Sequence, residues 1–204
     1  MKLLSKLIFQ CLVLAISACS ESSQQADPDF QPRDNTTSMT SVVNTVVVVD
    51  EAHNNFLTIS DRYKPFKQVL SNNGYKVRSN TRSFTPDRLN KVDILVIANA
   101  LDRNRSDWQP PFGRTLDDAE VNNIKKWVSD GGSLLLIADH TPFPKVIENL
   151  ALAFGFEFSN GHVRSYVFRS ADNTLAEHPI TTGANKNSSL ESIIPMSMKA
   201  SNET

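Results

Sequence analysis

Cysteine is nearly absent from this chain of 204 residues, which contains only two, Cys11 and Cys19. Both lie in or directly after an apolar N-terminal stretch, and no thiol follows them. The part of the chain beyond residue 19 therefore forms no disulfide within itself and needs an ordinary hydrophobic core. It also has no thiolate, which excludes any reaction that passes through a thioester.

An excess of positive charge is also missing. The chain carries 21 basic residues against 22 acidic ones, and its formal net charge is −1. Two of the basic residues, Lys2 and Lys6, precede the apolar N-terminal stretch or lie at its start, so the remainder is slightly more acidic. With no basic patch, we expect no nucleic-acid partner.

The N-terminus has the pattern of a secretory leader. Lys2 and Lys6 are followed by an apolar stretch from about Leu7 to Ile16 and then by small residues. The stretch is too short to span a bilayer comfortably and is followed by no stop-transfer charges. We therefore predict a signal peptide over residues 1–18.

The end of this leader, Ile16-Ser17-Ala18-Cys19, resembles the bacterial lipobox. That resemblance implies cleavage before Cys19, a diacylglycerol on its sulfur and an acyl chain on its new amine. Each buried methylene of such chains contributes about 0.8 kcal/mol, so the anchor is expected to hold firmly in the membrane. Ser20 follows, which by resemblance to known sorting preferences favours the outer membrane, with the protein facing the periplasm. The alternative is a plain secretory signal in which the Cys falls by chance.

Three further regions follow the leader. Residues 19–41 contain the lipidated Cys and a polar stretch with two Pro, which predicts a flexible tether. Residues 42–183 form the predicted domain. Residues 184–204 are polar and read either as a mobile tail or as a chain that stops before its last structural unit.

Strands are predicted from short apolar runs. Val42–Val49 is almost entirely β-branched, and Val92–Ala98 and Ser133–Ala138 are similarly apolar. Continuous runs of this kind are typical of strands covered on both faces. Tyr75–Arg78 predicts a further short strand, and the segments "FEFSN" and "VRSYVF" predict half-exposed strands or a hairpin.

Helices are predicted between these strands. One begins with Ser60 as its cap and ends before Gly74, a short one begins at Thr85-Pro86, and one covers "FPKVIENLALAFG". The clearest is "TLDDAEVNNIKKWVSDGG", where Thr115 and Asp118 resemble a capping box. Strands that alternate with helices predict an α/β fold, an open and mostly parallel sheet with helices on both faces.

Polar residues follow three of the apolar runs. They are Asp50, Glu51, His53, Asn54 and Asn55 after the first, Asn99 after the second, and Asp139 and His140 after the third. Ligands of open parallel sheets bind beyond the carboxyl ends of the strands, so these side chains predict a shared site. The alternative is that they cap helices, form turns or lie on the surface.

The segments "VVVVDEAHNNFLTISDRYKPFKQVLSNNGYKV", "VDILVIANAL" and "VSDGGSLLLIADHTPFP" resemble an uncharacterised family of bacterial lipoproteins. The domain of that family is similar to the class I glutamine amidotransferase fold. The pattern that ends in "HPITTG" is also similar to trehalose-utilisation-type proteins. This resemblance covers about Val42–Gly183 and implies a flavodoxin-like sheet.

In glutaminases of this type, the turn after the strand equivalent to "SLLLIA" presents a nucleophilic Cys. Here the turn reads Asp139-His140, with no Cys or Ser. The resemblance therefore implies the scaffold without the glutaminase reaction.

Two functions remain in competition. The first is a binding module for a small polar or glycan-derived ligand, with Asn54, Asn55 and Asn99 among its contacts. The second is a periplasmic hydrolase, in which Asp139 or Glu51 acts as general base and His53 or His140 as its partner. A metal site built from these carboxylates and imidazoles is a weaker option, because no HExxH-like spacing occurs. We expect no cofactor.

Overall fold

The computed structural model of the chain describes residues 25–32, 44–105, 107–161, 167–169, 171–178, 192–193 and 198–199. The predicted leader and the lipidation site Cys19 lie outside these residues. Within the described residues, no helix combines the length and the apolar character that a membrane crossing requires.

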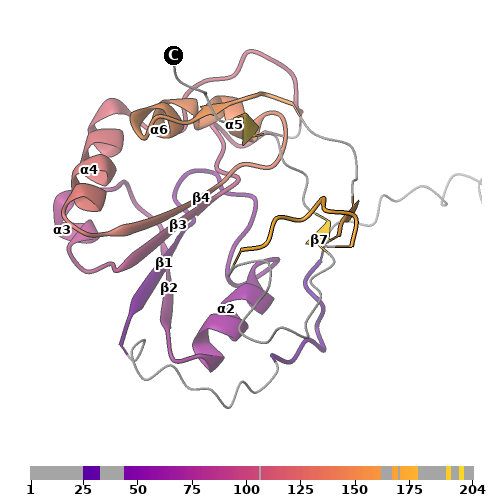
Figure 1. Ribbon diagram of the computed structural model, residues 1–204. Coiled ribbons are helices and arrows are strands. Elements are labelled where there is room, and N and C mark those ends of the chain that lie inside the picture. Colours follow the sequence, from indigo (N-terminus) through magenta and orange to yellow (C-terminus); the bar gives the residue numbers. More distant parts are fainter. Residues whose placement is uncertain are drawn as a thin grey trace, which may run out of the picture.

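The core of the fold is a four-stranded parallel sheet (Figure 1). Its strands are β1 (Val46–Asp50), β2 (Lys76–Asn80), β3 (Ile94–Ala98) and β4 (Ser133–Ile137), in the order β2-β1-β3-β4. These are the first four positions of the flavodoxin-like order. The predicted α/β fold with an open parallel sheet is confirmed.

Helices cover both faces of this sheet (Figure 1). Helix α2 (Lys64–Asn72) lies on one face, and α3 (Pro86–Leu89), α4 (Asp118–Ser129) and α6 (Glu148–Ala153) lie on the other. Strand residues alternate between the two faces, as the period of two requires. Val47, Val49 and Val96 therefore pack toward α2, whereas Val48, Leu95 and Ile97 pack toward the other helices.

The central strands are buried on both faces, which explains their continuous apolar runs. Val49, Leu95 and Ile97 have no exposed surface. Full burial of each such side chain contributes about 1.5–3 kcal/mol relative to an exposed one. The sheet is thus held rigidly, and the loops at its carboxyl edge begin from fixed points.

Two predicted helix starts are wrong. Helix α4 is capped by Asp117, whose side chain accepts from the backbone N–H of Glu120 at 2.8 Å, and not by Thr115 with Asp118. The Glu120 carboxylate reaches back to the Asp117 N–H, which completes a capping box two residues later than expected. Helix α2 begins after Tyr63, so Ser60 lies in the preceding turns and not at the cap.

The predicted helix over "FPKVIENLALAFG" is divided into α5 (Phe143–Val146) and α6 by Ile147, whose φ of −105° and ψ of 5° leave the helical region. The two segments predicted as strands or a hairpin do form short strands, β5 (Glu157–Phe158) and β6 (Val167–Phe168). They do not pair with each other. Instead, β5 pairs with β8 (Met198–Lys199) and β6 pairs with β7 (Ser192–Ile193), both antiparallel. These partners lie within the predicted C-terminal tail.

Candidate functional site

The loops after β1, β3 and β4 are joined at the carboxyl edge of the sheet. The backbone N–H of Leu101 donates to the His53 carbonyl at 2.9 Å, which connects the first two loops. The Asn99 side-chain oxygen accepts from the Asp139 N–H at 3.3 Å, which connects the second and third. The polar residues that follow the three strands therefore belong to one edge, although their side chains point to different neighbours.

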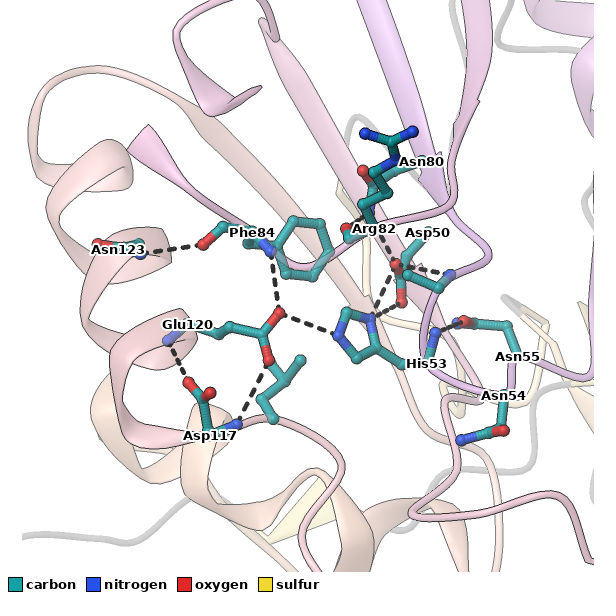
Figure 2. A network of polar contacts seen from close by, with 12 residues as sticks. Asp50, His53, Asn54, Asn55, Asn80, Arg82, Phe84, Asp117, Glu120 and Asn123 are labelled. Carbon is teal, nitrogen blue, oxygen red and sulfur yellow. Dashed lines mark hydrogen bonds and ion pairs between the residues drawn. The ribbon is translucent and has the colours of Figure 1, made fainter. Parts of the chain in front are cut away.

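His53 lies between two carboxylates in the interior of this edge (Figure 2). Its Nδ1 is 2.8 Å from Oδ2 and 3.0 Å from Oδ1 of Asp50, and its Nε2 is 3.1 Å from Oε1 of Glu120. All three side chains are buried, and the imidazole stacks on Phe84 with ring centroids 5.1 Å apart. Both ring nitrogens therefore have a partner within the protein.

Glu120 was not predicted as a site residue. Its Oε1 accepts from the Phe84 N–H at 2.9 Å as well as facing His53, and it belongs to the capping box of α4. One carboxylate thus connects the β1 loop, the segment after β2 and the start of α4. The sequence did carry a signal, because Asp117 and Glu120 have the capping-box spacing.

The charge state of His53 follows from its two partners. Burial alone would lower the pKa of His53, but the hydrogen bond and charge of Asp50, together with Glu120, outweigh it and raise the pKa above the ordinary value of 6.5. A protonated imidazole donates from both nitrogens, which matches an acceptor on each side. The site therefore favours an imidazolium held between carboxylates.

A groove of about 680 Å³ lies beside this network, between the segment after β2 and the start of α4. Its lining includes His53, Arg82, Arg114 and Thr115. Arg114 pairs with Asp118 at 3.0 Å, and His53 is bonded to its two carboxylates. The imidazole of His53 in the lining of the groove is therefore already hydrogen-bonded to Asp50 and Glu120 through both ring nitrogens.

Glu51 and the three predicted asparagines make bonds that shape the loops. Glu51 accepts from the Ile59 N–H at 2.8 Å. Asn55 accepts from the His53 N–H at 2.9 Å and donates to the Ala98 carbonyl at 3.3 Å, and Asn54 donates to the Leu101 carbonyl at 3.4 Å. Asn54 and Asn99 have φ values of 50° and 46°, a left-handed conformation in which Asn is enriched. Their predicted role in ligand binding stays a prediction.

Asp139 and His140 form a second polar group at the end of β4, and it is accessible. The side chains are 36% and 45% exposed, and Nε2 of His140 is 3.9 Å from Oδ1 of Asp139. The His140 Nδ1 lies 2.6 Å from the Thr141 carbonyl, so this nitrogen carries the proton. In the neutral imidazole Nε2 is then an acceptor. Tyr63 lies near this group, and burial and the Asp139 charge raise its pKa.

Aromatic rings adjoin this second group. Trp108, His140 and Phe143 have ring centroids 5.3–6.2 Å apart, and we call these three side chains the aromatic platform. Trp108 was missed in the sequence, where its only signal is an aromatic residue in a Pro-rich segment, "DWQPPF". The platform therefore adds an apolar surface to the polar pair Asp139 and His140.

Three of the four predicted catalytic residues thus fall into two groups. His53 contacts Asp50 and Glu120, whereas Asp139 lies beside His140, which belongs to the platform. The fourth, Glu51, accepts from the Ile59 N–H and belongs to neither group. The described contacts connect the groups through loop backbone and Asn99. Among the residues that the structure describes, no three His, Cys, Asp or Glu side chains form a group that could hold a metal ion.

Comparison with known proteins adds little to this picture. No family model matches the chain, and no curated protein matches it. A solved structure described as the "mmIFT52 N-terminal domain" is similar, with 17% sequence identity and a TM-score of 0.47 over 66% of this chain. The match covers 51% of that chain, so this protein spans about half of it. The strand order β2-β1-β3-β4 and the helix layers of the chain itself show its α/β fold.

Proposed function

We propose that this protein is a membrane-anchored lipoprotein whose α/β domain binds a small polar or glycan-derived ligand at the carboxyl edge of the sheet. One observation supports binding at Asp139 and His140 in particular. His53 has both ring nitrogens bonded to buried carboxylates, whereas the side chains of Asp139 and His140 are partly exposed. Polar groups on loops above a rigid sheet are the usual contacts of a small ligand.

Binding without a covalent reaction agrees with the residues present. The resemblance to class I glutamine amidotransferases implies that the nucleophile of that fold would lie in the turn where this chain has Asp139-His140. Neither side chain supplies the thiolate that the glutaminase reaction requires. A scaffold that has lost its nucleophile still has the strand-end loops that hold a ligand.

A hydrolase is the alternative, and the exposed pair of Asp139 and His140 supports it. A carboxylate 3.9 Å from an imidazole nitrogen can pass protons to and from a bound water. In this scheme Asp139 or Glu51 is the general base and His140 or His53 its partner. Because Glu51 already accepts from the Ile59 N–H and His53 is buried between two carboxylates, Asp139 and His140 are the stronger pair.

The binding proposal is tested with the purified mature protein and a panel of amino acids, nucleotides, organic acids and oligosaccharides. A ligand at 100 times its Kd should stabilise the fold by about 2.7 kcal/mol, which is measured as a thermal shift. Asp139→Asn and His140→Ala should abolish the shift, and Asp118→Asn, an exposed carboxylate on α4, should leave it unchanged. Failure of every compound to shift the protein refutes the proposal, and release of product supports the hydrolase.

The anchor is tested separately in cells. Cys19→Ser should prevent labelling by radioactive palmitate and release the domain from the membrane fraction. Cys11→Ser is the matched control, because it removes a thiol from the leader and leaves the lipobox intact. Membrane association of the Cys19→Ser protein after its leader has been cleaved would contradict the lipid anchor.

A further inference from the structure

The aromatic platform consists of one buried ring below two accessible ones. Phe143 is 2% exposed, whereas Trp108 is 39% exposed and the His140 side chain 45%. Trp108 meets His140 at an interplanar angle of 77° and Phe143 at 56°, so neither contact is a parallel stack. The indole is therefore fixed from one side and keeps apolar surface toward solvent.

A buried ion pair holds the segment that carries Trp108. The Arg105 side chain is fully buried, and its Nη2 donates to Asp102 Oδ2 at 2.7 Å. Arg105 also donates to the carbonyls of Gln109 and Pro111, on the other side of Trp108. A half-exposed indole on a segment pinned on both sides is pre-organised, which lowers the entropy lost when a ligand stacks on it.

The polar groups beside the platform are hydrogen-bond acceptors. Asp139 offers a carboxylate beside the platform. Within the platform, the neutral form of His140 offers Nε2, because its Nδ1 is committed to the Thr141 carbonyl. A ligand that fits must combine an apolar face with several hydroxyl donors at its rim. A pyranose in which the ring substituents are equatorial has this form, since its axial C–H groups make an apolar face and its hydroxyls point outward.

We infer that the platform, with Asp139 at its edge, is the subsite for a neutral, gluco-configured sugar ring that stacks on Trp108 and donates hydroxyl hydrogen bonds to Asp139 and His140. This inference rests on the proposed ligand-binding function and names its ligand class. A cationic ligand would also be attracted by an indole and a carboxylate. A cation is disfavoured because a positive charge of the protein already lies nearby and would repel it. The Arg62 guanidinium is 3.9 Å from the ring centroid of Phe56, and the Phe56 ring is 6.5 Å from that of Phe143.

The test uses tryptophan fluorescence of the mature protein titrated with cellotriose and with tri-N-acetylchitotriose. The chain has two Trp residues, and the other, Trp127, is only 9% exposed, so a change on sugar binding reports on Trp108. Trp108→Ala should weaken binding, read by calorimetry, about tenfold or more, and Trp108→Phe should keep most of the affinity but lose the fluorescence change. Phe156→Ala is the control, because Phe156 is 53% exposed and lies outside the platform.

Each outcome separates this inference from the function on which it rests. Sugar binding that is weakened by Trp108→Ala and Asp139→Asn but not by Phe156→Ala supports the subsite. Binding of choline, spermidine or another non-sugar compound, with no sugar bound, overturns the inference and leaves the binding function standing. Sugar binding that is unaffected by Trp108→Ala also overturns it. Absence of binding by any compound refutes both.

Discussion

Nε2 of His53 and Oε1 of Glu120 lie 3.1 Å apart although the two residues are 67 positions apart in the chain. This contact connects the loop after β1 to the first turn of α4, on the face of the sheet that α4 covers. Because Asp50 holds the other ring nitrogen, His53 acts as a bridge between a strand end and a helix start (Figure 2). The bridge has consequences for stability that can be measured without knowing the ligand.

Loss of the Glu120 carboxylate should destabilise the fold. Glu120→Ala leaves a buried imidazolium with one partner and the Phe84 N–H with none, and breaking a buried charge pair from one side costs about 3 kcal/mol or more. Urea unfolding measures the change in the free energy of unfolding. Asp118→Ala, in the same helical turn but exposed, should change it by less than about 1 kcal/mol. Equal effects of the two substitutions would contradict the bridge.

Stability should fall as the pH rises above neutral. The pKa of His53 is higher in the folded state than the ordinary value of 6.5, so the folded state binds the proton more tightly. The resulting stabilisation is fully present below the unfolded pKa and is lost as the pH rises through the folded pKa. Urea unfolding at a series of pH values from about 6 upward should show the decline. This decline of stability with pH should be shallower in His53→Gln and unchanged in His140→Gln. A decline that disappears in His140→Gln instead would show that its assignment to His53 is wrong.

A methyl group at Gly132 should be poorly tolerated. A Cβ built at this position overlaps the indole of Trp127, whose backbone carbonyl also accepts from the Gly132 N–H. Trp127 packs in the core between α4 and the sheet, so Gly132→Ala should cost about 2 kcal/mol through overpacking. Gly161→Ala is the control, since nothing lies within 4 Å of its Cβ. The Tm of both variants, measured by thermal unfolding, tests this prediction. An unchanged Tm for Gly132→Ala would contradict the close packing of Gly132 against Trp127.

Removal of the Asp102 carboxylate should loosen the segment that carries Trp108. Asp102 accepts from Arg105 and from the Gly113 N–H, both at 2.7 Å, and Asp102→Ala leaves the buried guanidinium without its one buried carboxylate partner among the described residues. We expect a loss of about 3 kcal/mol and easier acrylamide quenching of Trp108 fluorescence. Asp107→Ala removes an exposed carboxylate 3.6 Å from the same Arg and should change neither measurement appreciably. Unchanged quenching in Asp102→Ala would show that the ion pair does not fix the loop.

The two central strands, β1 and β3, could be predicted from the sequence because their burial is visible in it. Val47–Val49 and Leu95–Ile97 are apolar without interruption, and the structure buries them on both faces. The gathering of Asp50, Asn99 and Asp139 at one edge followed from the parallel order alone. These features depend on chain direction and periodicity, which a sequence displays directly.

The partners of each side chain could not be predicted in the same way. Glu120 lies on the helix that the sequence marks most clearly, yet the prediction placed the cap at Thr115 and gave Glu120 no role. Whether a Glu in the first turn of a helix is buried depends on which loop packs above it, and that is decided by tertiary contacts of His53 and Phe84. Trp108 was missed for a similar reason, since its place next to His140 depends on a loop pinned by Arg105.

The left-handed backbone at Asn54 and Asn99 means that an Asn at such a sheet edge is not by itself evidence for ligand binding. A β-branched residue in that conformation is strained by about 1–2 kcal/mol, while Gly or Asn is accommodated. Backbone geometry alone is thus a sufficient reason for both amides to be present. A designer who wished to graft a new specificity onto this scaffold would do best to leave these two corners untouched and vary the side chains around Trp108.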